Sequence, residues 1–253
     1  MSSTEPAVDP GPFDLPGDGR AAALCLHGLT GTPYEVRSLG EALSAAGVRA
    51  VGPWMDGHGG SPEDLARVPG EAWVEGARRR LRTLRSEHET VFVVGLSMGG
   101  LVTLLLAAEE EVDAAVSIGA PLAFRQPLPL LLPVLRHVVP FVRKKVGSDI
   151  RDPVARARHP SMPVMPLAAV HQLVRLQRRV RTALPRVEAP LLVAHGAHDS
   201  TAHPGDAERI VAAVGSGVRK HLVLEDSAHV VPVDHGGPRL AREVVGFLGD
   251  HAV

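Results

Sequence analysis

Residues 90–101, TVFVVGLSMGGL, decide the fold of this chain. The first seven of them are rich in β-branched side chains, which favours a short buried strand. The pattern G-x-S-x-G follows at residues 95–99, and apolar residues typical of a helix continue to Ala108. A strand, a very tight turn and a helix in this order form a nucleophile elbow, whose glycines let two backbone segments pass without a Cβ clash. Ser97 is therefore the candidate nucleophile, with its hydroxyl presented at the top of a sheet.

Short apolar runs alternate with amphipathic stretches on both sides of this motif. Strands are predicted at residues 21–26, 48–54, 112–118, 191–195 and 221–224. Helices are predicted at residues 34–46, 71–87, 98–108, 205–214 and 238–248, and a loop at 56–69. Apolar strands without polar alternation, separated by helices, indicate a mostly parallel sheet that is covered on both faces. The predicted fold class is therefore α/β.

Residues 121–186 interrupt this pattern, because they contain ten prolines and no convincing strand. Several short helices divided by prolines are expected there. An insertion of this size between two strands is most simply a cap over the carboxyl edge of the sheet, where loops usually carry function. A scaffold extension without ligand contact is the alternative. We predict a flexible tail at residues 1–19, a core formed by residues 20–120 and 187–253, and a mainly helical inserted cap at 121–186.

The charge balance excludes several classes of partner. The 253 residues carry 27 basic and 28 acidic side chains, which gives no general attraction to nucleic acid or anionic lipid. Arginine-rich helix surfaces at residues 78–85 and 175–181 are expected to be solvated. The most apolar stretch, residues 128–142, is divided by prolines and is too short for a membrane span. Residues 1–19 lack the features of a signal peptide, and the single Cys25 excludes an intrachain disulfide. We expect a cytoplasmic protein without an integral membrane segment or a nucleic-acid partner.

Ser97 needs a base, and that base needs an acid to orient it. In proteins with a nucleophile elbow the chain order is Ser, then Asp or Glu, then His. Asp199 follows the predicted strand LLVAH, and His229 follows the predicted strand segment HLVLE. Both therefore lie in loops at the carboxyl ends of strands, where partners of Ser97 have to converge. Three other carboxylates are alternatives to Asp199: Asp206, Asp226 and Asp234.

The chain has 13 histidines, which first suggests a metal site. His195, His198 and His203 lie near Asp199 in the sequence, but their spacing matches no standard zinc motif and no cysteine completes one. We interpret His195 as the end of a strand and the other two as loop or surface residues. Histidines in glycine-rich loops are more often structural hydrogen-bonding groups than bases, which applies to His27 and His58. We predict no metal and no cofactor.

The developing oxyanion needs hydrogen-bond donors, and two backbone N–H groups are the usual solution. One is expected at Met98, directly after the nucleophile. The other is expected at Leu29, in the glycine-rich loop HGLTG at residues 27–31 that follows an early strand. An ordinary glycine-rich turn is the alternative interpretation of this loop.

With these residues identified, the chain resembles α/β-hydrolases of the bacterial carboxylesterase and monoacylglycerol lipase group. The similarity rests on five segments in the expected order: LCLHGLTGTP (24–33), DGHGGSPEDL (56–65), VGLSMGGL (94–101), HGAHD (195–199) and DSAHVV (226–231). The resemblance implies an α/β-hydrolase fold and a cap that corresponds to the proline-rich insertion. It also implies a role for each matching residue: nucleophile for Ser97, acid for Asp199, base for His229 and oxyanion-hole amides for Leu29 and Met98.

The sequence departs from the family pattern at two positions. Leu29 stands where many members have Phe, and Ala228 precedes the histidine where the family often has Gly. Neither change removes a catalytic atom, but either can reshape the acyl pocket or the loop. The resemblance thus supports ester hydrolysis more strongly than any one substrate.

The implied activity is hydrolysis of short- to medium-chain carboxylic esters, with monoacylglycerols as candidate substrates, through an acyl-enzyme on Ser97. The expected partner is a small-molecule ester, and the expected state is a monomer or a homodimer. The alternatives are another acyl-transfer enzyme (a thioesterase, an acyltransferase or a peptidase) and a non-catalytic ligand-binding protein of the same fold. Apolar cap residues are candidates for lining the acyl pocket, packing of the cap against itself being the alternative: Leu128, Leu132, Leu135 and Val139.

Overall fold

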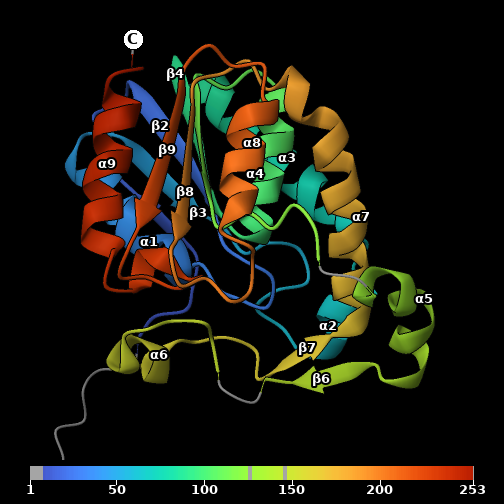
Figure 1. Cartoon of the computed structure of the whole chain (residues 1–253). Coiled ribbons are helices and arrows are strands. Elements are labelled where there is room, and N and C mark those ends of the chain that lie inside the picture. Colours follow the sequence, from blue (N-terminus) through green and yellow to red (C-terminus); the bar gives the residue numbers. More distant parts are fainter. Residues whose placement is uncertain (1–7, 125–126, 145–146, 253) are drawn as a thin grey trace, which may run out of the picture.

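A seven-stranded sheet forms the centre of the computed structural model, which describes residues 8–124, 127–144 and 147–252 (Figure 1). Its strand order is β1-β3-β2-β4-β5-β8-β9, and every neighbouring pair is parallel except β1 with β3. The strands are β1 (Phe13–Leu15), β2 (Ala21–Leu26), β3 (Arg49–Gly52), β4 (Thr90–Leu96), β5 (Ala114–Ile118), β8 (Leu191–Gly196) and β9 (Arg219–Leu224). The mostly parallel α/β sheet predicted from the sequence is confirmed.

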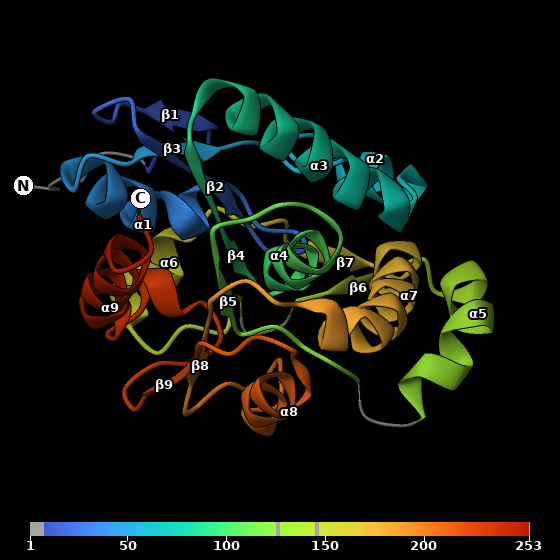
Figure 2. The ribbon, with the colours of Figure 1, turned by 90° about the horizontal axis from the view of Figure 1, so that it is seen from above.

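Helices cover both faces of the sheet (Figure 2). One face carries α1 (Tyr34–Ala45) and α9 (Gly237–Gly249). The other face carries α3 (Gly70–Glu87), α4 (Met98–Glu109), α7 (Leu167–Ala183) and α8 (Gly205–Ala213). The shorter helices are α2 (Pro62–Arg67), α5 (Leu128–Val138), α6 (Pro153–Arg158), η1 (Leu184–Arg186) and η2 (Val231–Val233).

Burial explains the composition of the central elements. Every residue of β2 and of β4 is buried, because each strand has a neighbour on both sides and helices on both faces. Helix α4 is apolar on nearly all sides, since it packs against the sheet as well as against α3 and α7. Cys25 lies in the buried β2, as the sequence predicts, and burial raises the pKa of its thiol to about 12.

The predicted flexible tail at residues 1–19 is wrong for its later part. Phe13–Leu15 form β1, which pairs antiparallel with the edge strand β3. The Phe13 ring fits against two glycines, and a Cβ at Gly52 would lie 2.1 Å from it. A three-residue strand between prolines and glycines shows no periodicity in the sequence, and it forms because β3 offers an unpaired edge.

The insertion at residues 121–186 also differs from the expectation of short helices alone. It contains the two-stranded antiparallel sheet of β6 (Phe141–Arg143) and β7 (Val164–Pro166), and α7 extends over 17 residues. Figure 1 shows α5, α6 and these two strands at the end of the molecule to which the arrows of the central sheet point. The predicted loop at 56–69 likewise contains α2, which begins with a capping box of Ser61 and Asp64.

The arginines of α3 are paired with carboxylates rather than only solvated. Arg82 contacts Glu110 at 2.9 Å, and Arg85 contacts Glu111 at 2.8 Å. Both acids follow α4, so these ion pairs join the ends of two neighbouring helices.

Within the described residues, no helix is both long enough and apolar enough to cross a membrane.

Candidate active site

Ser97 occupies a strained turn between β4 and α4. Its φ of 57° and ψ of −113° lie in a region that residues with a Cβ rarely adopt, at a cost of about 1–3 kcal/mol. Glycines make the turn possible: a Cβ at Gly95 would lie 2.2 Å from the carbonyl oxygen of Gly99, and a Cβ at Gly99 would lie 2.2 Å from that of Leu26. The N–H of Ser97 donates to the carbonyl of Ile118 at 2.7 Å, which ties the turn to β5. This is the elbow geometry that the sequence predicts.

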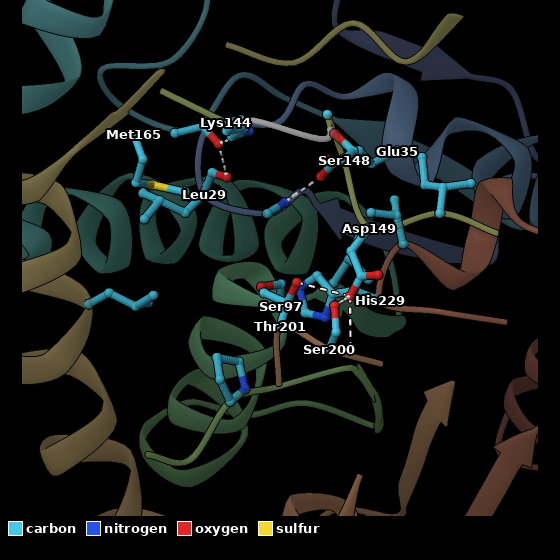
Figure 3. Close-up of a pocket in the computed structure, with 18 of the residues that line it drawn as sticks. Leu29, Glu35, Ser97, Lys144, Ser148, Asp149, Met165, Ser200, Thr201 and His229 are labelled. Atoms are coloured by element: carbon cyan, nitrogen blue, oxygen red, sulfur yellow. Dashed lines mark hydrogen bonds between the residues drawn. The ribbon is translucent and has the colours of Figure 1, made fainter. Parts of the chain in front are cut away.

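Three loops at the carboxyl ends of β4, β8 and β9 bring together Ser97, Asp199 and His229. His229 donates from Nδ1 to Asp199 Oδ2 at 2.8 Å, and both side chains are buried. Ser97 and His229 line the same cavity (Figure 3). The second oxygen of Asp199 accepts the N–H groups of Thr201 at 2.9 Å and Ala202 at 2.7 Å. The structure thus brings together the three side chains that the sequence indicates as candidates for nucleophile, base and acid.

The other carboxylates considered for the acid have other partners. Asp206 accepts the N–H of Leu122 at 2.9 Å, next to the start of α8. Asp226 is exposed. Asp234 accepts several backbone N–H groups, including that of Ala228 at 2.8 Å. Asp199 is therefore the carboxylate that meets His229.

His195 lies near the end of β8, as interpreted from the sequence, but it also contacts Asp199. Its Nε2 lies 2.9 Å from Asp199 Oδ2, the same oxygen that His229 contacts. Spacing alone does not reveal this contact, because residues 195 and 199 are brought together by the tight turn after β8. Asp199 is thus held between two imidazoles. His198, by contrast, is exposed, as expected.

Asp199 and His229 shift each other's pKa. Burial opposes ionisation of Asp199, but the charge of His229, the nearby His195 and the hydrogen bonds from His229 and the Ala202 N–H outweigh it and lower the pKa of Asp199. Burial also disfavours the protonated His229, but the neighbouring carboxylate more than offsets this and raises its pKa. An ionised Asp199 therefore orients His229 and stabilises its charged form.

The glycine-rich loop at residues 27–31 is held by histidines whose ring nitrogens act as acceptors. His58 Nε2 accepts the N–H of Thr30 at 3.1 Å, and His27 Nε2 accepts the N–H of Met55 at 3.1 Å. Burial, reinforced by the neighbouring His27, lowers the pKa of His58 to about 3, so the ring stays neutral. Both histidines are structural hydrogen-bonding groups, as predicted. Thr30 has a φ of 61°, which gives this loop a second strained turn.

This loop lies against the serine elbow. A Cβ at Gly28 would be 3.4 Å from Cβ of Ser97. Over the described part of the chain, the N–H groups of Leu29 and Met98 have no protein acceptor. Two unused backbone donors therefore flank the nucleophile, in the residues that the sequence indicates for an oxyanion hole.

A cavity of about 530 Å³ opens beside Ser97. One part of its lining is apolar and comes mainly from α7 and the chain around it: Leu29, Phe124, Met165, Val170 and Leu173. The other part is polar: Glu35, Lys144, Ser148, Asp149, Ser200 and Thr201. Figure 3 shows Leu29 and Met165 to one side of Ser97, and Glu35, Ser148 and Asp149 to the other. The site offers an apolar and a polar arm that meet at the serine.

Three of the cap residues predicted to line an acyl pocket, Leu132, Leu135 and Val139, are not among the residues that line the cavity beside Ser97. Leu132 is fully buried and packs, with Leu135, against apolar residues of α7. Val139 is 42% exposed. The side chain of Leu128 lies outside the described part of the structure. The alternative interpretation, packing of the insertion against itself, is the correct one for Leu132 and Leu135, because α7 separates α5 from the cavity.

Sequence reasoning missed Asp149, which joins the insertion to the catalytic loops. Its Oδ2 accepts the N–H and the hydroxyl of Ser200, both at 2.9 Å, and the hydroxyl of Thr201 at 3.0 Å. Its carbonyl accepts the N–H of Val230, next to His229, at 3.1 Å. No motif identifies this residue, because its partners are 51 and 52 positions away for the two side-chain hydroxyls.

The sequence and the fold are both similar to those of known lipolytic enzymes. The profile of the family described as "Serine aminopeptidase, S33" matches residues 17–235. The chain is 30% identical over 238 residues to the thermostable monoacylglycerol lipase of Bacillus sp. (strain H-257), covering 93% of each chain. It is 27% identical over 242 residues to a carboxylesterase of Bacillus subtilis (strain 168), covering 95% of this chain and 97% of that one.

A solved structure shares the fold closely. It comes from work on LipS and LipT, two metagenome-derived lipolytic enzymes, and it matches with a TM-score of 0.91 at 27% sequence identity. The match covers 98% of this chain and 100% of that chain. The similarity therefore extends over the core and the insertion alike.

Proposed function

This chain belongs to the serine aminopeptidase S33 family, whose fold here is that of the α/β-hydrolases, and from that premise we propose that it hydrolyses carboxylic esters with Ser97 as nucleophile, His229 as base and Asp199 as acid. The observation that carries the proposal is the 2.8 Å contact of Asp199 with His229, which lines the same cavity as Ser97. Relatives named as a monoacylglycerol lipase and a carboxylesterase, matched over nearly their whole length, support an oxygen ester as the substrate.

The geometry implies an acyl-enzyme mechanism. Ser97 Oγ attacks the ester carbonyl while His229 Nε2 takes its proton, and Asp199 stabilises the imidazolium through Nδ1. The N–H groups of Leu29 and Met98 bind the oxyanion of the tetrahedral intermediate. His229 then donates its proton to the departing alcohol, which leaves the acyl group on Ser97. A water molecule, deprotonated by His229, attacks this acyl-enzyme, and the carboxylic acid is released as Ser97 regains its proton.

The two arms of the cavity suggest how an ester is oriented. The apolar arm, with Met165, Val170 and Leu173, suits a short- to medium-length acyl chain. The polar arm, with Ser148 and Asp149, suits a hydroxylated alcohol such as the glycerol of a monoacylglycerol. In this proposal the insertion at residues 121–186 is a cap that closes the cavity over the carboxyl edge of the sheet. A monomer or homodimer in the cytoplasm remains the expected state.

A chain-length series tests this function. Purified protein is assayed on p-nitrophenyl esters from acetate to laurate and on the matching monoacylglycerols, together with Ser97→Ala and the surface control Ser86→Ala. We expect activity in the wild type and in Ser86→Ala and its loss, by at least about 10,000-fold, in Ser97→Ala. Hydrolysis that survives in Ser97→Ala would contradict the assignment of the nucleophile.

The family description names a peptidase, so a second candidate is an amide substrate. Turnover of a matched oxygen ester, thioester and anilide with the same acyl group separates the esterase from a thioesterase and a peptidase. Labelling by a fluorophosphonate distinguishes all of these from a non-catalytic binding protein. We expect Ser97 to be labelled and the oxygen ester to be hydrolysed fastest. A faster reaction with the anilide would favour the peptidase.

A further inference from the structure

The first turn of α1 contains a buried carboxylate that the mechanism above does not use. Glu35 is 5% exposed, which is rare for an acidic residue without a strong partner. Its Oε2 accepts the N–H of Gly28 at 2.8 Å. Its Oε1 lies 3.2 Å from Nε2 of His159, which belongs to the insertion. One carboxylate therefore contacts both the loop that carries Leu29 and the segment above it.

The loop at residues 27–31 is shaped around this carboxylate. A Cβ at Gly31 would lie 2.3 Å from both oxygens of Glu35, and a Cβ at Gly28 would lie 3.2 Å from one of them. The two glycines thus let the loop close over the acid, with Leu29 between them. This contact explains the spacing of glycines in HGLTG, which the oxyanion role of Leu29 alone does not require.

Glu35 stays ionised despite its burial. Burial alone would raise the pKa of its carboxyl, but the contact with His159 and the hydrogen bond from Gly28 outweigh that effect and lower the pKa to about 2. An ionised carboxylate accepts stronger hydrogen bonds than a neutral group, so it holds the Gly28 N–H firmly.

His159 is itself anchored in the insertion. Its Nδ1 lies 2.7 Å from the hydroxyl of Ser148, which is 3.0 Å from the hydroxyl of Ser161. The insertion also holds the other end of the loop. The N–H of Met162 donates to the carbonyl of Thr30 at 2.9 Å, and Lys144 Nζ donates to the Thr30 hydroxyl at 2.7 Å.

We propose, on the basis of the function proposed above, that Glu35 is a positioning residue for the oxyanion hole. The peptide of Gly28 is fixed by its N–H bond to Glu35, and the next donor along the chain is the N–H of Leu29. His159, from the insertion, lies 3.2 Å from the other oxygen of this carboxylate, so the insertion and the core meet at the group that holds the Gly28 peptide. Loss of one oxyanion donor costs about 100- to 1,000-fold in kcat, and a displacement of about 1 Å can cost about 100-fold.

The test compares Glu35→Ala with Glu35→Gln and with Glu41→Ala, an exposed acid on the same helix. Active sites are first counted by fluorophosphonate titration, so that unfolded protein does not affect the rates. We expect kcat per site to fall about 10- to 100-fold in Glu35→Ala without a comparable rise in KM. Glu35→Gln keeps a carbonyl acceptor for the Gly28 N–H and should stay within about 5-fold of the wild type, as should Glu41→Ala.

A second readout separates positioning from general stability. An alkyl boronic acid adds to the serine as a tetrahedral anion and therefore requires the oxyanion hole, whereas an n-alkanol of the same chain length carries no anionic oxygen. In Glu35→Ala the boronate should bind at least about 10-fold more weakly, with little change for the alkanol. Equal weakening of both ligands, or wild-type kcat per site, would overturn the proposal.

A double-mutant cycle covers the case in which Glu35→Ala folds poorly. A methyl group at position 31 collides with the Glu35 carboxylate, so Gly31→Ala should lower kcat about 10-fold in the wild type and have little further effect in the Glu35→Ala background. His159→Ala should lower kcat by a smaller factor, about 3- to 10-fold. Independent, multiplicative effects at positions 31 and 35 would refute the coupling. If instead wild type and Glu41→Ala show no Ser97-dependent hydrolysis, the proposed function fails, not the role of Glu35.

Discussion

The role of a histidine in this protein depends on the atom its ring faces, not on its neighbours in the sequence. His229 and His195 lie 2.8 and 2.9 Å from the same oxygen of Asp199, and His229 also lines the cavity beside Ser97. His27 and His58 are buried without a contacting carboxylate, and their rings accept backbone N–H groups instead. The same side chain thus contacts a carboxylate in one place and accepts a backbone N–H in another.

The pKa of His229 predicts the acidic limb of the pH–rate profile. Protonated His229 cannot accept the proton of Ser97, so kcat/KM should rise as pH increases through its pKa. Asp199 raises this pKa above the ordinary value of 6.5, so the midpoint should lie above 6.5. In Asp199→Asn the midpoint should move to lower pH and kcat should fall by about 10,000-fold. His198→Ala, an exposed control, should keep the wild-type limb; a flat profile between pH 5 and 8 would exclude His229 as the base.

The backbone strain at Ser97 predicts a difference between two inactive variants. Glycine adopts a φ of 57° without a Cβ clash, whereas alanine retains the strain. After the larger entropy loss of glycine on folding is subtracted, Ser97→Gly should be more stable to urea than Ser97→Ala by about 1 kcal/mol. Equal unfolding midpoints would mean that the turn is not strained.

Among the elements, the β4–α4 elbow depends on close backbone contact, whereas the insertion depends on side-chain hydrogen bonds. The elbow is set by glycines that allow α4 to approach the end of β2. The insertion is held by Asp149 and Asp234, which accept N–H groups from the loops around Ser200 and Ala228. Asp234 also accepts the N–H groups of the insertion, at Arg151 and Asp152. These contacts make the insertion part of the site's framework.

Two glycine substitutions test how closely the elements pack, and they should change the stability of the protein in opposite directions. A Cβ at Gly99 would lie 2.2 Å from the carbonyl oxygen of Leu26, so Gly99→Ala should separate α4 from the sheet and destabilise the protein by about 3 kcal/mol or more. Gly246 is an exposed position of α9 with no atom within 4 Å of its Cβ site, so Gly246→Ala should stabilise by up to about 1 kcal/mol. Urea unfolding measures both, and equal effects would contradict the close approach at the elbow.

At the scale of the whole molecule, one edge of the sheet gathers the chemistry. The parallel strands β2, β4, β8 and β9 all end there, and their loops supply the candidate donors, nucleophile, acid and base. These loops also need a rigid sheet beneath them. The complete burial of β2 and β4 on both faces keeps the sheet rigid, because opening its centre exposes the apolar core of both layers.

The reactivity of the Cys25 thiol shows whether the centre of the sheet stays closed. Its side chain is fully buried in β2, and burial raises its pKa to about 12, so the native thiol should react with DTNB only through global unfolding. We expect negligible reaction in buffer and one thiol per chain in denaturant. Cys25→Ala should remove the signal. Reaction of the native protein at the rate of a free thiol would show that β2 opens locally.

Much of the fold and the central part of the site follow from local sequence. The long buried strands and helices have clear apolar patterns, and the elbow around Ser97 has its glycines. Elements with short patterns were not predicted, namely β1, α2 and the pair β6 and β7. The contact of His195 and the anchoring by Asp149 were also missed, because both join parts of the chain that only folding brings together.

The sequence by itself determined the α/β class, the elbow motif around Ser97 and the candidate order of serine, acid and histidine, because each follows from apolar patterns or short motifs along the chain. The tertiary structure alone decided which side chains line the cavity. It placed α7 between α5 and the cavity, so that Val170 and Leu173 line the cavity while Leu132 packs inside the insertion. It also placed Glu35 beneath the loop of Leu29. The sequence does not distinguish an apolar or acidic residue that lines the cavity from one that packs elsewhere. Only the packing of the helices and strands decides which of them can contact a substrate.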